Sequence, residues 1–256
     1  MATTAAPPAM PAPEPQASIS ALGRVTGVLF SPKPTFQDIA RKPDWIVPMV
    51  VLLLTGLVLN FALASHTNWT EVSRQQIEKS KFASSQIDRL DDAKKAEAYD
   101  RAAKQNKIGR YVRGVIGWPL LLLFATAIYF GAYRLVGGAR VTFGLSFALV
   151  AFAHLPMALK ELLGALVTML KDPSAIDPEN YLASNPAALL GPDTPTWQMV
   201  PLASLDVFAI WTLLLVAVAF AAADPKKLPF GKSVGIAVSV SVGLMLFFTM
   251  IAWIFS

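Results

Sequence analysis

Five long apolar stretches occupy nearly half of this chain and constrain its fold more than any other feature. They cover residues 46–64, 115–136, 143–170, 201–222 and 233–255. Each has about the 20 residues that an α-helix needs to cross a bilayer, and none alternates apolar with polar residues as a half-buried strand does. A helix buried in a soluble protein would explain one such stretch but not five. The sequence therefore predicts an all-α, polytopic membrane bundle with five transmembrane helices.

The amino-acid composition is typical of a membrane protein and excludes every kind of site that needs cysteine. Hydrophobic residues make up 54% of the chain, charged residues only 15%, and the mean hydropathy is +0.50. Cysteine is absent, which excludes disulfides, thiol nucleophiles and thiolate metal sites. The net charge of +5 comes mainly from connectors and span ends, where basic residues commonly flank membrane helices. We therefore expect no nucleic-acid partner.

The amino-terminal region divides into a tail and a helical segment before the transmembrane domain at residues 44–256. Residues 1–17 are rich in Ala and Pro, lack a targeting pattern, and are predicted to be disordered. Residues 18–43 predict two short amphipathic helices in the membrane interface, with the apolar face turned to the acyl chains. A helix packed on the protein at the cytosolic surface is the alternative. The apolar residues at helical spacing are Ile19, Leu22, Val25, Val28 and Leu29. The basic candidates for lipid or partner contact are Arg24, Lys33, Arg41 and Lys42.

The distribution of basic residues predicts a cytosolic amino terminus and a carboxyl terminus on the opposite side. Nine Lys and Arg residues fall in the connectors that would be cytosolic, whereas the connector after the third apolar stretch holds only Lys171. The connector at residues 65–114 runs against this pattern, because it carries eleven basic and seven acidic residues. Long connectors are translocated largely regardless of charge, so the orientation stands as an expectation.

The connector at residues 65–114 is predicted to form a charged helix or helical hairpin that projects from the membrane. It contains no Pro and is rich in Ala, Lys, Gln, Glu and Arg. Lys104, Lys107, Arg110 and Arg113 recur at three-residue steps near the bilayer. These four residues are candidates for contact with anionic lipid or an acidic partner. The alternative is a solvated face with snorkelling side chains.

A few polar residues inside the apolar stretches are the candidate intramembrane site, because ionisable groups in hydrocarbon are costly and tend to be paired or functional. They are His154, Pro156, Lys160, Glu161 and Asp206. Pro156 predicts a kink just after His154, and Glu161 returns to nearly the same helix face as His154. We interpret His154 as a hydrogen-bonded packing residue rather than a metal ligand or proton relay.

Depth in the membrane predicts a specific ion pair. With a rise of about 1.5 Å per residue, Lys160 lies about 26 Å from the cytosolic end of its span and Asp206 about 8 Å from the outer end of its own. Both therefore belong near the outer leaflet. An ion pair that locks two neighbouring helices is the expected arrangement, and a substrate or proton pathway is the alternative.

Small residues at four-residue spacing indicate close helix contacts. One ladder is Gly56, Asn60 and Ala64, and the other is Gly235, Ser239 and Gly243. Packing within the molecule is the simpler interpretation of both, and dimerisation is the alternative.

Enzyme signatures such as HExxH, GxSxG or a phosphate-binding glycine loop are missing from the sequence. We therefore predict no catalytic, cofactor-binding or metal-binding residue. A permease is a live alternative, although the spans contain no chain of ionisable residues and no strong inverted repeat.

Three ordered segments resemble bacterial members of the Yip family, five-span relatives of the Ypt/Rab-interacting membrane proteins. The segments are LFSPKPTFQDIARKPDWIVP, YRLVGGARVTFGLSFALVAFAHLP and LDVFAIWTLLLVAVAF, and the resemblance covers about residues 20–255. It implies a helical bundle in a bacterial inner membrane with a cytosolic amino terminus. Eukaryotic relatives bind small GTPases in vesicle trafficking. We expect a non-enzymatic protein that organises membrane lipids, other membrane proteins or copies of itself. The alternative is a permease for ions or small solutes, or a subunit of a transport complex.

Overall fold

The computed structural model describes residues 19–191 and 194–254, and the described chain is almost entirely helical. The predicted disordered tail at residues 1–17 lies outside the described residues. The helices are α1 (Ala21–Phe30), α2 (Pro32–Arg41), α3 (Ile46–His66), α4 (Trp69–Lys79), α5 (Lys81–Ile87), α6 (Asp92–Leu135), α7 (Phe143–Ala153), α8 (Leu155–Leu170), α9 (Thr196–Ser204), α10 (Val207–Ala223) and α11 (Phe230–Ile254), with 3₁₀ turns at Pro173–Ala175 and Pro186–Leu189.

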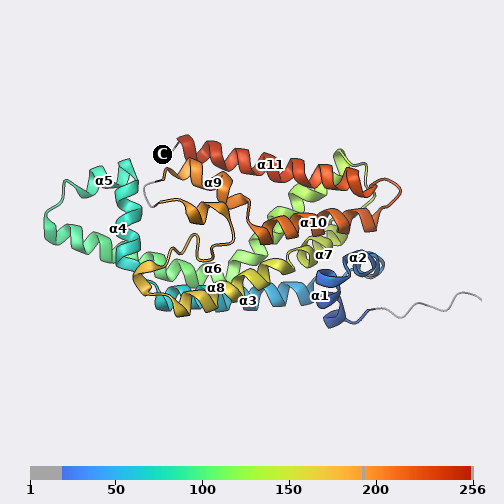
Figure 1. Cartoon of the computed structure of the whole chain (residues 1–256), viewed down its shortest axis with the longest axis horizontal. Coiled ribbons are helices and arrows are strands. Elements are labelled where there is room, and N and C mark those ends of the chain that lie inside the picture. Colours follow the sequence, from blue (N-terminus) through green and yellow to red (C-terminus); the bar gives the residue numbers. More distant parts are fainter. Residues whose placement is uncertain (1–18, 192–193, 255–256) are drawn as a thin grey trace, which may run out of the picture.

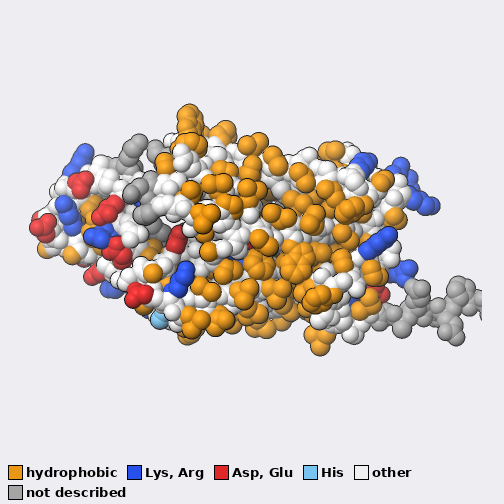
Figure 2. All heavy atoms as spheres, viewed as in Figure 1, with side chains coloured by type: hydrophobic (Ala, Val, Ile, Leu, Met, Phe, Trp, Pro, Cys, Tyr) orange, Lys and Arg blue, Asp and Glu red, His pale blue; other side chains and the backbone are white. Residues whose placement is uncertain are grey.

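Four helices are long and apolar enough to cross a membrane: α3, α6, α7 with α8 taken together, and α11. The bent pair α9 and α10 adds a fifth span if it is counted as one. Hydrophobic side chains form a broad band between two ends that carry the charged side chains (Figure 2). α1 and α2 lie at the opposite end of the long axis from the carboxyl end of α11 (Figure 1). The predicted all-α polytopic membrane bundle is confirmed.

The third apolar stretch is broken at the position that the sequence predicts. α7 ends at Ala153 and α8 begins at Leu155, with His154 between them and Pro156 in the first turn of α8. Proline has no N–H to continue the hydrogen-bond ladder, but this loss is small in the first turn of a helix, where the N–H groups lack intrahelical partners. The two helices therefore remain stacked as one broken span.

The fourth apolar stretch differs from the prediction of one helix over residues 201–222. The chain breaks at Leu205 and Asp206, and α9 and α10 meet at an angle of 51°. The Asp206 carboxylate accepts hydrogen bonds from the backbone N–H groups of Phe208 (2.9 Å) and Ala209 (3.2 Å). An Asp that caps a helix stabilises a new helix start more than a continued helix. Asp206 is therefore the cap of α10, at the break between the two helices.

The bundle core forms where α3 packs against α6 and α8, and where α10 packs against α2, α7 and α11. Leu52, Leu122, Leu149 and Phe152 are completely buried. In the same core, the ring of Phe220 stacks on that of the buried Tyr133 with 3.9 Å between centroids. These contacts hold α6 and α10 together near the end that carries α2.

The two ladders of small residues have different environments. In the first, a Cβ atom at Gly56 would lie 2.8 Å from the Trp118 ring of α6, and Asn60 and Ala64 are buried. Packing within the molecule is confirmed for this ladder. In the second, on α11, a Cβ atom at Gly235 or Gly243 would meet nothing within 4 Å. The prediction of internal packing is wrong there, because α11 meets the bundle with its other face.

The charged connector is helical, as predicted. α4 packs along the start of α6, and the Asn106 amide donates a hydrogen bond to the Ser73 hydroxyl (2.9 Å). α6 then continues without interruption into the second apolar stretch, for 44 residues in total. The connector therefore forms a helical hairpin whose second arm is the start of a membrane helix.

The amino-terminal helices pack on the bundle. α2 lies against α10 and α7, and Val28, Phe36 and Ile39 have no exposed surface. The prediction that the apolar face is turned to acyl chains is wrong for Val28, because the rest of the protein covers it. Leu22 and Phe30 of α1 remain largely exposed. An interfacial location of this segment depends on those two side chains and stays a prediction.

Candidate functional site

Two polar clusters meet on neighbouring residues of α8. Lys160 and Glu161 are adjacent in sequence, so their side chains leave the helix about 100° apart. Lys160 reaches the start of α10 and the connector before it, whereas Glu161 reaches α3 and α6. The candidate residues of the sequence are therefore brought into two separate sites.

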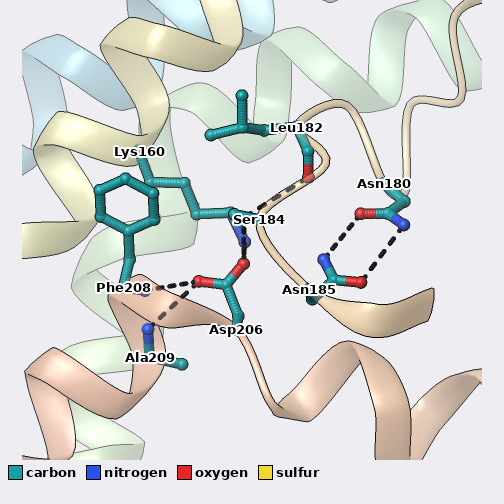
Figure 3. Close-up of polar contacts among 8 residues, drawn as sticks. All are labelled: Lys160, Asn180, Leu182, Ser184, Asn185, Asp206, Phe208 and Ala209. Carbon is teal, nitrogen blue, oxygen red and sulfur yellow. Dashed lines mark hydrogen bonds and ion pairs between the residues drawn. The ribbon is translucent and has the colours of Figure 1, made fainter. Parts of the chain in front are cut away.

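The first cluster, which we call the Lys160 cluster, comprises Lys160, Ser184 and Asp206 (Figure 3) together with Tyr181. The Lys160 ammonium lies 2.8 Å from an Asp206 carboxylate oxygen. The Ser184 hydroxyl donates to the same oxygen, and the Tyr181 ring centroid lies 5.7 Å from the ammonium. The side chains of Lys160 and Asp206 are 15% and 3% exposed. The ion pair that the similar membrane depths of Lys160 and Asp206 predicted is thus present, and solvent has little access to it.

The described part of the 171–195 connector, residues 171–191, packs over this ion pair with Tyr181 and Ser184. The backbone N–H of Val207 donates to the Ser184 carbonyl (3.1 Å), and the side chains of Asn180 and Asn185 bond to each other (2.9 Å). Burial, with the carboxyl groups of Glu161 and Asp206 nearby, raises the pKa of Tyr181 above its ordinary value. The phenol is neutral at pH 7 even at its ordinary pKa. Its ring lies against Gly164, where a Cβ atom would come within 2.4 Å.

Sequence reasoning missed Ser184 and Tyr181. Both lie in a polar connector with no periodicity, where a hydropathy profile gives no signal. The one available indication was Gly164, a residue without a side chain in the middle of an apolar helix, which is typical of close approach by another group.

The second cluster, the Glu161 cluster, comprises Thr55, Trp118 and Glu161. The Thr55 hydroxyl donates to one carboxylate oxygen of Glu161 (2.6 Å), and the Trp118 indole N–H donates to the other (2.9 Å). No Lys, Arg or His in the described chain forms an ion pair with Glu161. A buried carboxyl group is costly unless it is hydrogen-bonded. The two donors meet that need and tie α3, α6 and α8 together.

His154 lies beside the Glu161 cluster without touching the carboxyl group. Its Nδ1 is 2.7 Å from the Val150 carbonyl, so the proton of a neutral ring belongs on Nδ1. Its ring meets the Trp118 ring edge to face, with 6.1 Å between centroids. These contacts favour the interpretation of His154 as a packing residue. Among the described residues, no three His, Asp or Glu side chains gather as metal ligands.

Two of the basic candidates for lipid contact are buried in protein. Arg24 is 4% exposed, donates to the Asp38 carboxylate (2.8 Å) and to the Lys42 carbonyl (3.0 Å), and so holds α1 on α2. Arg110 is 8% exposed and bonds to Glu179 of the 171–195 connector. The prediction of lipid contact is wrong for both, because a carboxylate within the protein already binds each guanidinium.

The other basic candidates are on the surface. Lys33, Arg41 and Lys42 lie at the α2 end, and Lys104, Lys107 and Arg113 lie on α6. Arg113 is 4.0 Å from Glu179, at the limit of an ion pair. The basic strip on α6 is therefore interrupted at Arg110, and its lipid or partner role stays a prediction.

Comparison with known proteins gives one match. The model of the Yip1 domain matches residues 26–252, which include both polar clusters, all of α2 to α10, and most of α1 and α11. A search of the curated proteins found no match, and neither did a search of the solved structures. Because the matched region spans most of the chain, this membrane protein belongs to the Yip1 domain family.

Proposed function

We propose that this chain is a non-enzymatic, five-span protein that organises membrane lipids or partner proteins. The observation that carries the proposal is how the polar groups inside the spans are used. Lys160 bonds to Asp206, and Glu161 bonds to Thr55 and Trp118. Each contact joins different helices, so these groups work as structural locks. In a transporter, intramembrane ionisable groups instead mark the path of the substrate or ion.

The proposed topology counts α9 and α10 as one bent span and puts the amino terminus in the cytosol of a bacterium. It is supported by the exposed basic side chains at the α2 end, which include Lys33, Lys42, Lys226 and Lys227. Basic residues near span ends favour the cytosolic side. An odd number of spans also agrees with the opposite positions of α1 and the carboxyl end of α11.

The second candidate function is a permease, or a subunit of a transport complex, with His154, Glu161 and Asp206 along the pathway. Such a pathway needs a hydrated cavity beside these residues. Two hollows in the described chain, of about 480 and 440 Å³, lie near Arg134 and near Lys33 and are lined by none of these three residues. The contacts that already occupy Glu161 and Asp206 favour the organising role.

Reconstitution tests the two candidates against each other. The purified protein is placed in liposomes and assayed with a panel of ions, protons and small solutes. We expect no flux above protein-free liposomes, and affinity purification from crosslinked membranes should recover specific protein partners. Reproducible flux that is lost in His154→Ala or Glu161→Gln, but kept in the exposed control Lys104→Gln, would overturn the organising role.

A further inference from the structure

A basic hollow lies where α6 ends and α7 begins. It has a volume of about 480 Å³. Its lining comes from the last turn of α6 and the short connector that follows: Arg134, Gly138, Ala139, Arg140, Val141 and Thr142. These residues belong to the segment YRLVGGARVTFG, to which neither polar cluster of the spans gives a role.

The connector that forms the hollow is held in place from several sides. Gly138 has a φ of 69°, which favours glycine. A Cβ atom at Gly137 would lie 2.3 Å from the Tyr133 carbonyl, so this position also needs glycine. The Lys232 ammonium donates to the Gly137 carbonyl (2.7 Å). The backbone N–H of Arg140 donates to the Asp224 carboxylate (2.9 Å). The hollow is therefore preformed by contacts with the start of α11 and the end of α10.

The charge of the hollow is not neutralised by the protein. Arg134 and Arg140 are both exposed. The Arg134 guanidinium lies 5.5 Å from the Phe130 ring centroid, and in the part of the chain that the structure describes neither Arg forms an ion pair. Asp224, the carboxylate nearby, accepts backbone N–H groups instead. Two guanidinium groups thus line one hollow without a carboxylate between them.

Apolar surface adjoins the hollow directly. Leu135 and Val136, between the two Arg residues in sequence, are 85% and 72% exposed, and Phe143 is also exposed. Apolar side chains that are exposed at the ends of two spans favour acyl chains over water, next to the headgroup region that basic residues at span ends favour. A ligand that suits both surfaces has an anionic group and hydrocarbon chains.

We propose that this hollow binds the headgroup of an anionic phospholipid, with the phosphate at Arg134 and Arg140 and the acyl chains along Leu135, Val136 and Phe143. Guanidinium groups bind phosphate oxygens through paired N–H donors. Basic pockets between membrane helices are known to hold such headgroups. The site is separate from the organising role proposed above, because a permease would carry it equally well.

The test measures which lipid stays bound to the purified full-length chain in mild detergent, by native mass spectrometry. Phosphatidylglycerol and phosphatidylcholine with identical acyl chains are offered together. The site variant is Arg134→Gln with Arg140→Gln. The matched control is Lys226→Gln with Lys227→Gln, which removes the same charge from exposed side chains at the same end without touching the lining.

We expect the native chain to retain phosphatidylglycerol in preference to phosphatidylcholine. The site variant should lower the apparent affinity for phosphatidylglycerol about 30-fold, since each basic side chain near an anionic headgroup contributes about fivefold. The control should change the apparent affinity for phosphatidylglycerol less than about threefold, because exposed charges away from the bound headgroup are screened by salt. Arg134→Lys with Arg140→Lys keeps the charge but not the paired donors, and should give an intermediate loss.

Three results would overturn the proposal. One is an equal loss in the site variant and the control, which would indicate general attraction to basic residues. Another is equal retention of the two lipids by the native chain. The third is displacement of phosphatidylglycerol by millimolar inorganic phosphate, which would indicate a site for a soluble anion. Because both guanidinium groups are exposed, folding of the site variant is checked by size exclusion and circular dichroism, and the Lys variant provides the same comparison if the Gln variant is unstable.

Discussion

Breaking the Lys160–Asp206 ion pair should reveal how much it stabilises the bundle, and the two ends of the pair should respond differently. Asp206→Asn keeps the cap of α10 and a partner for Ser184, but it leaves the Lys160 ammonium, 15% exposed, with only the Tyr181 ring. Removing one partner of a buried pair costs about 3–5 kcal/mol. Since Lys160 keeps some contact with solvent, we expect about 3 kcal/mol of unfolding free energy to be lost.

Lys160→Met leaves the opposite charge unpaired, and we expect a smaller loss of about 2 kcal/mol. Three donors still serve the Asp206 carboxylate: the Ser184 hydroxyl and the N–H groups of Phe208 and Ala209. The positive end of the α10 dipole favours the carboxylate further. In the double variant neither charge is left alone, so its cost should fall below the sum of the single costs by about 2–3 kcal/mol.

The assay is reversible unfolding of the purified protein in mixed micelles by increasing dodecyl sulfate, followed by circular dichroism, for all four members of the cycle. Lys104→Met is the control, because its side chain is exposed on α6, and it should change the unfolding free energy by less than about 0.5 kcal/mol. If the two single costs add to within about 0.5 kcal/mol in the double variant, the ion pair does not couple the two helices, contrary to the prediction.

Two further predictions concern packing and topology. Gly164→Ala should lower the unfolding free energy by about 1–3 kcal/mol and make the 171–195 connector more sensitive to protease, because the added Cβ atom would clash with the Tyr181 ring. Gly243→Ala is the control, because a Cβ atom there would meet nothing within 4 Å. Equal protease sensitivity of the two variants would contradict the prediction. In the cysteine-free chain, Lys227→Cys should react with an impermeant maleimide from the cytosolic side only and Lys104→Cys from the opposite side only; the reverse pattern would refute the orientation.

The sequence predicted those features of the fold that depend on neighbouring residues. The length of the apolar stretches predicted α3, the second half of α6, and α11. This works because a segment that crosses hydrocarbon must satisfy its own backbone hydrogen bonds and is therefore helical. Pro156 located the break between α7 and α8. The Lys160–Asp206 contact was also predictable, because the rise of a helix converts sequence position into depth, and charges at equal depth have few other partners.

The amino-acid sequence was enough to identify a membrane-spanning helical bundle, but it did not indicate which side chains meet inside that bundle. Thr55 and Trp118 lie 106 and 43 residues from Glu161, and no periodicity relates them. Arg110 has the spacing of a surface strip but is buried, and it bonds to Glu179 from a distant connector. The physical reason is that hydropathy records how each segment interacts with lipid, whereas helix contacts depend on close packing and on hydrogen bonds between helices, which a hydropathy pattern does not contain.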